Sequence, residues 1–470
     1  MNGKRLLAAV FAAIAVAGAM AQVQPKVTAN DLKADVSFLA SDALEGRGTP
    51  SKGLDIAAEY IAAEFRRAGL EPAGDDGYFQ TADFNSVSRN PEGVELTLEI
   101  GGHKIKVDRG SMALMEPGAV TLENTPMFVI SSGASAPTSE EVGEKPVLIN
   151  SPGMRSWGTG HPPLVVLMAQ APGARAGGAP VLRPVSAQAA APVLMVWDAA
   201  VREALAAGAA DIEVSAHIPA PVAQQSVKLR NVIGVLRGSD PALNDTYLVL
   251  TAHYDHLGVR GTGEGDHIYN GANDDASGTS SVVEIAKALA SLAQRPRRSI
   301  VFMTLFGEEL GELGSRYYCQ HPVFPLAKTV ADINLEQLGR TDDTEGPRLL
   351  RFNLTGFDYT DIAAFLSKAG EETGIRAVKH VENSDSFFGR SDNAAFADAG
   401  VPSTTLSVSY IFPDYHRPGD EWPKLDYDNM AKVDGAVALG VFRIADSIET
   451  PQWNKANPKT ARYIEAREKR

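Results

Sequence analysis

The second half of the sequence alternates continuous apolar segments, rich in β-branched residues, with segments of helical periodicity. Four segments have the composition of strands that are buried on both faces, namely 247–252, 299–306, 330–335 and 404–408. Between the first two, residues 281–292 place Val282, Ile285 and Leu289 at helical spacing. Strands without a polar face need cover on both sides. This alternation therefore predicts an α/β fold with a mixed, mostly parallel sheet and helices on both faces.

Five short segments of this region each place a histidine or a carboxylate just after an apolar run. The residues concerned are His253, Asp274, Glu309, Glu336 and His416. In open α/β sheets, ligands bind outside the carboxyl ends of the strands. Two imidazoles and three carboxylates are what two zinc ions sharing one bridging carboxylate need, and the lack of thiolate ligands favours a catalytic site over a closed structural one. The sequence predicts a centre with two Zn²⁺ ions per chain.

Two further carboxylates accompany the predicted ligands. Glu308 directly precedes Glu309, and adjacent buried carboxylates are costly unless a cation neutralises one of them. With Glu309 on a metal, Glu308 is free to take a proton from an attacking water and pass it to the leaving amine. Asp255 follows His253 by two residues, so both side chains leave the same strand face. We expect Glu308 to be the acid/base and Asp255 to orient His253 through its other ring nitrogen.

Each piece taken alone has an ordinary structural explanation. Glu308 and Glu309 can open an exposed helix, where acidic residues are favourable. Asp274 belongs to an Asn-Asp-Asp segment that can cap the following helix, and a loop histidine such as His416 is commonly solvated. The five pieces together, each at the end of a predicted strand, favour the metal centre.

Composition limits the possible functions. The chain has 470 residues, 44% of them hydrophobic, which suffices for two domains. It carries 58 acidic and 44 basic residues, a formal charge of −14, and no basic segment with interleaved aromatic residues. This balance argues against nucleic-acid binding. Cys319 is the only cysteine, so an intramolecular disulfide is excluded.

The first residues have the pattern of a secretory signal peptide, predicted over 1–21. Lys4 and Arg5 precede an apolar stretch over 6–16, and Ala19-Met20-Ala21 forms a small-x-small cleavage site. We therefore expect a secreted or periplasmic protein without stable membrane association after cleavage. An uncleaved membrane anchor is the alternative.

Composition also divides the rest of the chain. Residues 22–90 and 227–450 contain the helical and strand patterns of the predicted catalytic domain. The intervening 91–226 is rich in Ala, Pro and Gly, contains short apolar runs, and holds none of the site segments, which predicts a small β-rich inserted domain. Residues 451–470 are expected to form a polar, solvated C-terminal tail.

The site segments resemble a known family, the two-zinc exopeptidases of clan MH, and specifically secreted bacterial aminopeptidases with an inserted protease-associated-type domain. The resemblance covers roughly residues 30–90 and 228–450. The matching segments are 44–48, 252–258, 270–278, 307–311 with 314–315, 334–340, 391–393 and 415–416.

This resemblance implies a role for each matching position. Asp274 would bridge both ions, while His253 and Glu336 would each bind one zinc, on opposite metals from Glu309 and His416 respectively. Glu308 would be the acid/base and Asp255 the orienting group. Tyr415 would stabilise the tetrahedral oxyanion. The resemblance also implies a cis peptide bond between Asp274 and Asp275.

The function that the resemblance implies is an exported zinc aminopeptidase acting on peptide substrates. One departure concerns polarity, because Glu336 stands where these aminopeptidases commonly have Asp. A carboxypeptidase or dipeptidase is therefore an alternative, in which Arg390 could meet a substrate carboxylate. A single-zinc glutaminyl cyclase is a second alternative, although the full ligand set argues against it. A non-enzymatic receptor on this fold would lose ligands, and none is lost here.

Overall fold

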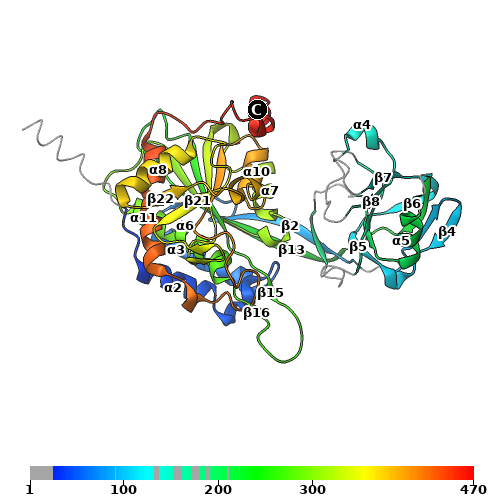
Figure 1. Ribbon diagram of the computed structural model, residues 1–470. Helices are drawn as coiled ribbons and strands as arrows, with labels where there is room; N and C mark the ends of the chain where they lie inside the picture. The colour runs from blue at the N-terminus through cyan, green and yellow to red at the C-terminus, as the bar shows by residue number, and fades with distance from the viewer. Residues whose placement is uncertain are drawn as a thin grey trace, which may run out of the picture. The chain divides into compact units, whose positions relative to one another are not determined.

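The computed structural model describes residues 25–89, 92–131, 137–151, 161–171, 180–185, 191–208, 211–221 and 223–470. The predicted signal peptide, 1–21, lies outside these ranges. The chain divides into a larger unit, Met1–Thr81 with Leu229–Arg470, and a smaller unit, Ala82–Lys228 (Figure 1). The smaller unit begins ahead of residue 91, the predicted start of the insert, because strand β2 (Phe79–Val87) already runs from one unit into the other.

The larger unit is built on a mixed sheet whose centre is parallel. Its strands lie in the spatial order β2, β13, β17, β14, β18, β23, β21 and β22, with β1 (Glu71–Pro72) beside β13. The other strands are β13 (Ala223–Leu236), β14 (Tyr247–His253), β17 (Ser299–Leu305), β18 (Thr329–Leu335), β21 (Arg351–Leu354), β22 (Arg376–Val378) and β23 (Ser403–Ser407). The four strands β17, β14, β18 and β23 are parallel, whereas β13 and β21 join antiparallel.

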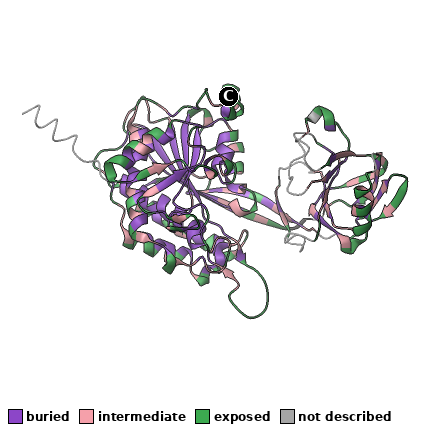
Figure 2. Cartoon of the chain, viewed as in Figure 1, coloured by how far each residue is buried: buried purple, intermediate pink, exposed green. Residues whose placement is uncertain are grey.

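Burial explains why the four parallel strands lack a polar face. Every residue of β14, β17, β18 and β23 is buried, as the purple strands at the centre of the larger unit show (Figure 2). Such strands are stable only when helices cover both faces of the sheet. The predicted α/β fold class is confirmed.

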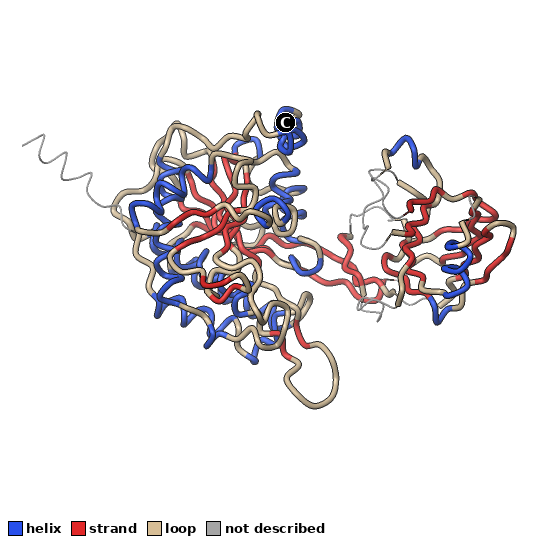
Figure 3. The backbone as a smooth tube through the Cα atoms, viewed as in Figure 1, coloured by secondary structure: helices blue, strands red, loops and turns tan. Residues whose placement is uncertain are grey.

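Two sets of helices provide this cover (Figure 3). One set packs together and against β14, and consists of α2 (Ala29–Leu39), α3 (Lys52–Arg67), α6 (Ser277–Ala290), α8 (Ile362–Thr373) and α11 (Tyr427–Asp446). The other set contacts β17, β18 and β23, and consists of α7 (Leu313–Gln320) and α10 (Asn393–Asp398). Within the described residues, the helices include none that is long and apolar enough to cross a membrane.

The C-terminal segment differs from the expected polar, solvated tail. Trp453 and Tyr463 are buried, and their rings stack with centroids 4.9 Å apart beside Phe388. The indole of Trp453 donates a hydrogen bond of 3.1 Å to the carbonyl oxygen of Gly400. Helix α12 (Ala461–Glu468) carries Tyr463 into this cluster. The prediction was wrong because two aromatic side chains in a polar segment suffice to anchor it.

Within its described residues, the smaller unit is β-rich and has two sheets. One sheet has the order β5, β11, β9, β8, β7 and the other β4, β3, β12, β6. The strands are β3 (Glu95–Ile100), β4 (His103–Lys106), β5 (Met112–Glu116), β6 (Val120–Pro126), β7 (Phe128–Ser131), β8 (Val147–Asn150), β9 (Val165–Met168), β11 (Val193–Val196) and β12 (Ile212–Ile218). Strand β10 (Val181–Pro184) pairs with β2, and the helices are α4 (Ser139–Val142) and α5 (Ala199–Ala206).

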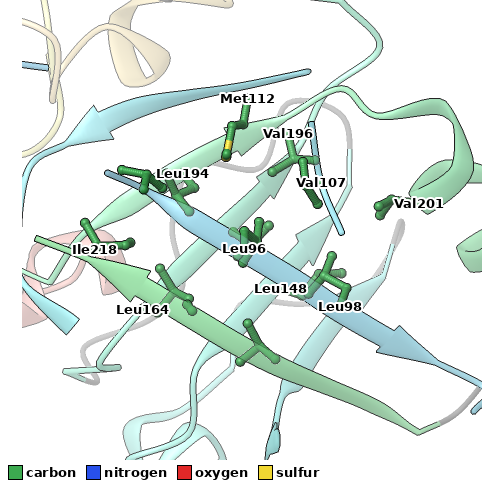
Figure 4. Close-up of a cluster of buried hydrophobic side chains, with 14 of the residues drawn as sticks. Leu96, Leu98, Val107, Met112, Leu148, Leu164, Leu194, Val196, Val201 and Ile218 are labelled. Atoms are coloured by element: carbon green, nitrogen blue, oxygen red, sulfur yellow. The ribbon is translucent and has the colours of Figure 1, made fainter. Parts of the chain in front are cut away.

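Alternating side chains fill the core of this smaller unit. In β3, Leu96, Leu98 and Ile100 are buried, while Thr97 and Glu99 between them are half-buried. Leu148 and Leu194, from the other sheet, belong to the same apolar cluster (Figure 4). The strand pattern of period two is thus explained by one face packed against the opposite sheet.

Candidate metal centre

The carboxyl ends of the central strands bring the predicted ligands to one place. His253 is the last residue of β14, Glu336 directly follows β18, and Glu309 lies in a short 3-10 turn after β17. Asp274 lies in the irregular turn ahead of α6, and His416 in the loop between β23 and α11. Because β17, β14 and β18 are parallel neighbours, their ends meet at the same edge of the sheet.

The five predicted ligands form two groups that share Asp274. In the first group, ligand atoms of His253, Asp274 and Glu336 all lie within 4.8 Å of one another. The Nε2 atom of His253 is 3.3 Å from Oδ1 of Asp274. In the second group, the Nε2 atom of His416 is 3.1 Å from Oδ2 of Asp274 and 3.4 Å from Oε1 of Glu309. The two oxygens of Asp274 therefore face two different histidines.

The chemistry of these atoms fits divalent cations. Three of them are buried without a hydrogen-bond partner, namely Nε2 of His253, Oδ2 of Asp274 and Oε1 of Glu309. Buried imidazole and carboxylate groups are normally paired, because leaving them unpaired is costly. Nitrogen and oxygen donors of this kind, without thiolate, suit zinc and similar ions. Cations at the two groups would satisfy all three atoms at once.

Buried hydrogen bonds hold the loop that carries Asp274. The Asp274–Asp275 peptide bond is cis, as predicted. The carboxylate of Asp420 accepts hydrogen bonds from the backbone amides of Asn273, at 2.9 and 3.1 Å, and of Asp274, at 3.0 Å. Asp275 in turn accepts a hydrogen bond of 3.1 Å from the backbone amide of Gln337, next to Glu336. The loops after β14 and β18 are thereby fixed to each other.

Asp255 lies close to His253, but its carboxylate does not hold the ring directly. The distance from Nδ1 of His253 to Oδ1 of Asp255 is 3.6 Å, too long for a hydrogen bond, whereas the backbone oxygen of Asp255 is 3.2 Å away. The carboxylate instead accepts hydrogen bonds from the backbone amide of Glu308, at 3.1 Å, and from the hydroxyl of Thr49, at 3.0 Å. Asp255 therefore links the end of β14, which carries His253, to the turn that carries Glu308.

Glu308 lies beside both groups without belonging to either. Its Oε2 atom is 3.9 Å from Nε2 of His253. Glycines with positive φ, Gly307 at 69° and Gly311 at 104°, bracket the 3-10 turn over Glu308–Leu310. Burial raises the pKa of Glu308 well above its usual value, and the neighbouring carboxylates raise it further. The side chain of the adjacent Glu309 belongs to the second group, so the turn directs the side chains of two consecutive glutamates to different places.

Tyr415 is half-buried and stacks on His416, with ring centroids 4.0 Å apart. Together with Glu336 it lines a cavity of about 50 Å³. The structure therefore places Tyr415 at the edge of the second group, within the part of the site open to a substrate.

Sequence reasoning assigned no role to His256, which the structure brings into the site. Its Nδ1 atom lies 2.8 Å from Oε1 of Glu309, so His256, Asp274 and Glu309 also form a possible ligand group. The ring lies against Gly271, where a Cβ atom would come within 2.4 Å of it. The signal was present as a second histidine three residues after His253. Strand periodicity could not place it, because β14 ends at His253.

Arg47 was also unassigned, and it joins the N-terminal segment to the site. The residue is fully buried. Its guanidinium donates hydrogen bonds to the backbone oxygens of Tyr254 at 2.8 Å, Asn270 at 2.8 Å, Gly271 at 2.9 Å and Leu39. Burial lowers its pKa to about 10, against the effect of nearby carboxylates. A single side chain therefore ties the end of α2 to the backbone just after His253 and just before Asp274.

Fold and site together define an α/β domain built to hold divalent cations at the carboxyl edge of its sheet. Residues 231–441 match Peptidase family M28. This match bears out the family resemblance inferred from the sequence over these residues.

Individual relatives agree with this assignment. Aminopeptidase YwaD of Bacillus subtilis is 25% identical over 236 residues, which cover 49% of this chain and 48% of the relative. A probable zinc metalloprotease of Leptosphaeria maculans is 39% identical over 220 residues, covering 45% and 46%. The chain thus spans about half the length of the curated relatives it matches. The solved aminopeptidase from Aneurinibacillus sp. strain AM-1 has the same fold, with a TM-score of 0.58 at 18% identity over 90% of this chain and 96% of that one.

Proposed function

We propose that the chain is an exported, zinc-dependent aminopeptidase that hydrolyses N-terminal residues from peptides. The observation that carries the proposal is the position of Asp274, whose two oxygens lie 3.3 Å from His253 and 3.1 Å from His416. A carboxylate that faces two histidines in this way suits a bridge between two metal ions. The match to a peptidase family supports peptide substrates, and a relative named as a zinc metalloprotease supports zinc.

The two ligand groups would each hold one ion. His253, Glu336 and one oxygen of Asp274 would hold the first, and Glu309, His416 and the other oxygen of Asp274 the second. Two zinc ions bound there would polarise the scissile carbonyl and lower the pKa of an attacking water. Asp420 fixes the backbone of Asp274 in this bridging position.

The remaining chemistry falls to two side chains. Glu308 lies outside both groups, and its carboxylate is free to accept a proton from the attacking water and to donate it to the leaving amine. Tyr415, which lines the cavity beside Glu336, would donate a hydrogen bond to the oxyanion that forms at the scissile carbonyl. Neither role requires either residue to bind a metal.

The charge of the site supports an aminopeptidase. Asp274, Glu308, Glu309 and Glu336 bring four carboxylates around two cation positions, and one of them, Glu336, lines the cavity, where a free α-amine of the substrate could pair with it. A carboxypeptidase or dipeptidase is the second candidate. One observation favours it, because Arg390 lines the cavity next to Glu336 and could meet a terminal carboxylate. A single-zinc glutaminyl cyclase would leave one of the two groups without a metal.

Peptide hydrolysis by the metal-loaded chain tests the proposal. Matched peptides with a free, an N-acetylated or a C-amidated terminus should be compared before and after dialysis against a chelator, with product analysis. We expect release of N-terminal residues from free and amidated peptides, loss of nearly all activity on chelation, and recovery with zinc at two ions per chain. Equal cleavage of N-acetylated peptides with release of C-terminal residues would establish a carboxypeptidase. Full activity with one ion per chain would refute the two-metal centre.

Export is proposed from residues 1–21 alone, which have the pattern of a signal peptide. Expression of the full chain in a Gram-negative host should give a periplasmic or extracellular protein whose N-terminus begins near Gln22. A cytoplasmic product that retains Met1 would contradict export and would leave the peptidase proposal intact.

A further inference from the structure

The cavity beside Glu336 has polar groups that the proposed reaction does not use. Its volume is about 50 Å³, and its lining includes Glu336, Gln337, Arg390, Ser407, Tyr410 and Tyr415. It therefore lies between a proposed metal ligand and the proposed oxyanion donor.

Arg390 contributes a cation without a counter-charge. Its guanidinium lies over the ring of Phe387, 4.3 Å from the ring centroid. Within the part of the chain that the structure describes, no carboxylate forms an ion pair with it. Nine other arginines among the described residues of the larger unit do form such pairs, among them Arg340 with Asp414 at 2.9 Å. Arginine favours planar, bidentate pairing with a carboxylate, so Arg390 is available to an anionic group entering the cavity.

Two buried polar atoms of the lining also have no partner among the described residues. They are the hydroxyl oxygen of Tyr410 and Oε1 of Gln337, in residues that are only 4% and 5% exposed. The ring of Tyr410 packs against the rings of Phe387 and His380, whose centroids lie 5.2 Å and 5.6 Å from its own. Buried hydroxyl groups are normally hydrogen-bonded. A ligand atom that accepts a hydrogen bond from Tyr410 would remove this deficit.

We propose that this cavity is a specificity pocket for a carboxylate of the substrate, with Arg390 as the specificity-determining residue and Tyr410 as a second donor. The inference rests on the proposed function, because the pocket adjoins Glu336 and Tyr415. An acidic side chain on the residue next to the scissile bond is one source of the carboxylate. The α-carboxylate of a very short peptide is the other. Both would pair with the guanidinium at the rim and accept the Tyr410 hydroxyl proton in a hydrogen bond.

Kinetics on matched substrates test the pocket, with the zinc-loaded full chain throughout. Glu-Ala-amide and Gln-Ala-amide differ only in side-chain charge, and Ala-Ala-amide and Ala-Ala differ only in the terminal carboxylate. We expect kcat/KM to favour Glu over Gln by about tenfold or more, the range for a hydrogen-bonded charged group. A preference for Ala-Ala over its amide, without a Glu preference, would assign the pocket to the α-carboxylate.

Variants identify the residues responsible. Arg390→Gln should reduce the carboxylate preference to within about twofold of unity, mainly through KM, whereas Arg390→Lys should retain part of it. Tyr410→Phe, which preserves shape, should lower the preference to an intermediate value. Arg376→Gln, an exposed arginine on β22, is the matched control and should keep the wild-type ratio. Thermal melting of each variant confirms folding.

The outcomes separate this inference from the proposed function. Equal kcat/KM for substrates with and without the carboxylate would refute the specificity pocket. So would a carboxylate preference that is unchanged in both Arg390→Gln and Tyr410→Phe. Neither result would contradict the proposed peptidase activity. Absence of hydrolysis of any peptide by the zinc-loaded chain would refute the proposed function, and the pocket assignment with it.

Discussion

Replacing Arg47 by methionine tests whether one buried side chain holds the N-terminal segment to the metal centre. Methionine keeps most of the apolar volume and leaves four backbone oxygens, of Leu39, Tyr254, Asn270 and Gly271, without their donor. Each unpaired buried acceptor costs about 1–3 kcal/mol. Part of this cost is offset, because the variant no longer buries a guanidinium. We therefore expect a loss of about 3–5 kcal/mol, the range for removing one partner from a buried charged network.

Thermal unfolding and zinc binding measure this effect. At roughly 2–4 °C per kcal/mol for a domain of this size, Arg47→Met should lower the Tm of the larger unit by at least about 6 °C. Zinc affinity, measured by competition with a chelator, should fall by about tenfold or more, as for other groups that support metal ligands. The matched control is Arg67→Met. Arg67 has a side chain that is 75% exposed, and its buried partner Glu64 keeps a second cation, Lys287, at 2.5 Å, so replacing Arg67 should cost less than about 1 kcal/mol.

The comparison between the two arginine variants decides the interpretation. If Arg47→Met and Arg67→Met melt within about 2 °C of each other, a difference of no more than about 1 kcal/mol, the four hydrogen bonds of Arg47 contribute little to stability. If the melting temperature falls but zinc affinity is unchanged, Arg47 stabilises the fold without positioning the loops of the metal centre.

Three further predictions follow from the site and its surroundings. Glu308→Gln should retain both metals, measured by elemental analysis, but lose about 10²–10⁴-fold in kcat, because the general acid–base is removed; a loss of less than about tenfold would exclude that role. Burial raises the pKa of Asp434 to about 8, so the folded state retains a proton that the unfolded state releases near pH 4. The free energy of unfolding should therefore fall as the pH rises between these values. Asp434→Asn should reduce this slope by up to about 1.4 kcal/mol per pH unit, measured by urea denaturation. Gly271→Ala should reduce zinc affinity and Tm, since its Cβ would lie 2.4 Å from the ring of His256, whereas Gly69→Ala, at a similar positive φ with nothing within 4 Å, should show only the backbone cost of about 1–2 kcal/mol.

Much of the larger unit was predictable because its sequence patterns are local. The runs that became β14, β17, β18 and β23 are apolar throughout, and strands buried on both faces require that composition. Within the predicted β-rich insert, β3 and β4 pair as an antiparallel hairpin. The C-terminal segment was not predicted, because the partners of Trp453 and Tyr463 lie far away along the chain, at Phe388 and Gly400.

By itself, the sequence determined which residues could be ligands and why they converge. A parallel α/β sheet places the ends of its strands at one edge, so His253, Glu309 and Glu336 had to meet there once the strands were recognised. The sharing of Asp274 between two histidines and the entry of His256 depend on distances between loops that no periodicity specifies.

The tertiary structure alone decided how these loops are held and what surrounds them. Asp255 forms its hydrogen bonds with Thr49 and Glu308, and not through the ring of His253, because folding brings segments about 50 and 200 residues away against it. The pocket around Arg390 likewise combines residues from four separate stretches of the chain. Side-chain type and order along the chain are local properties that a sequence states directly. The pairing of buried polar groups depends on the path of the whole backbone, and only the folded structure specifies it.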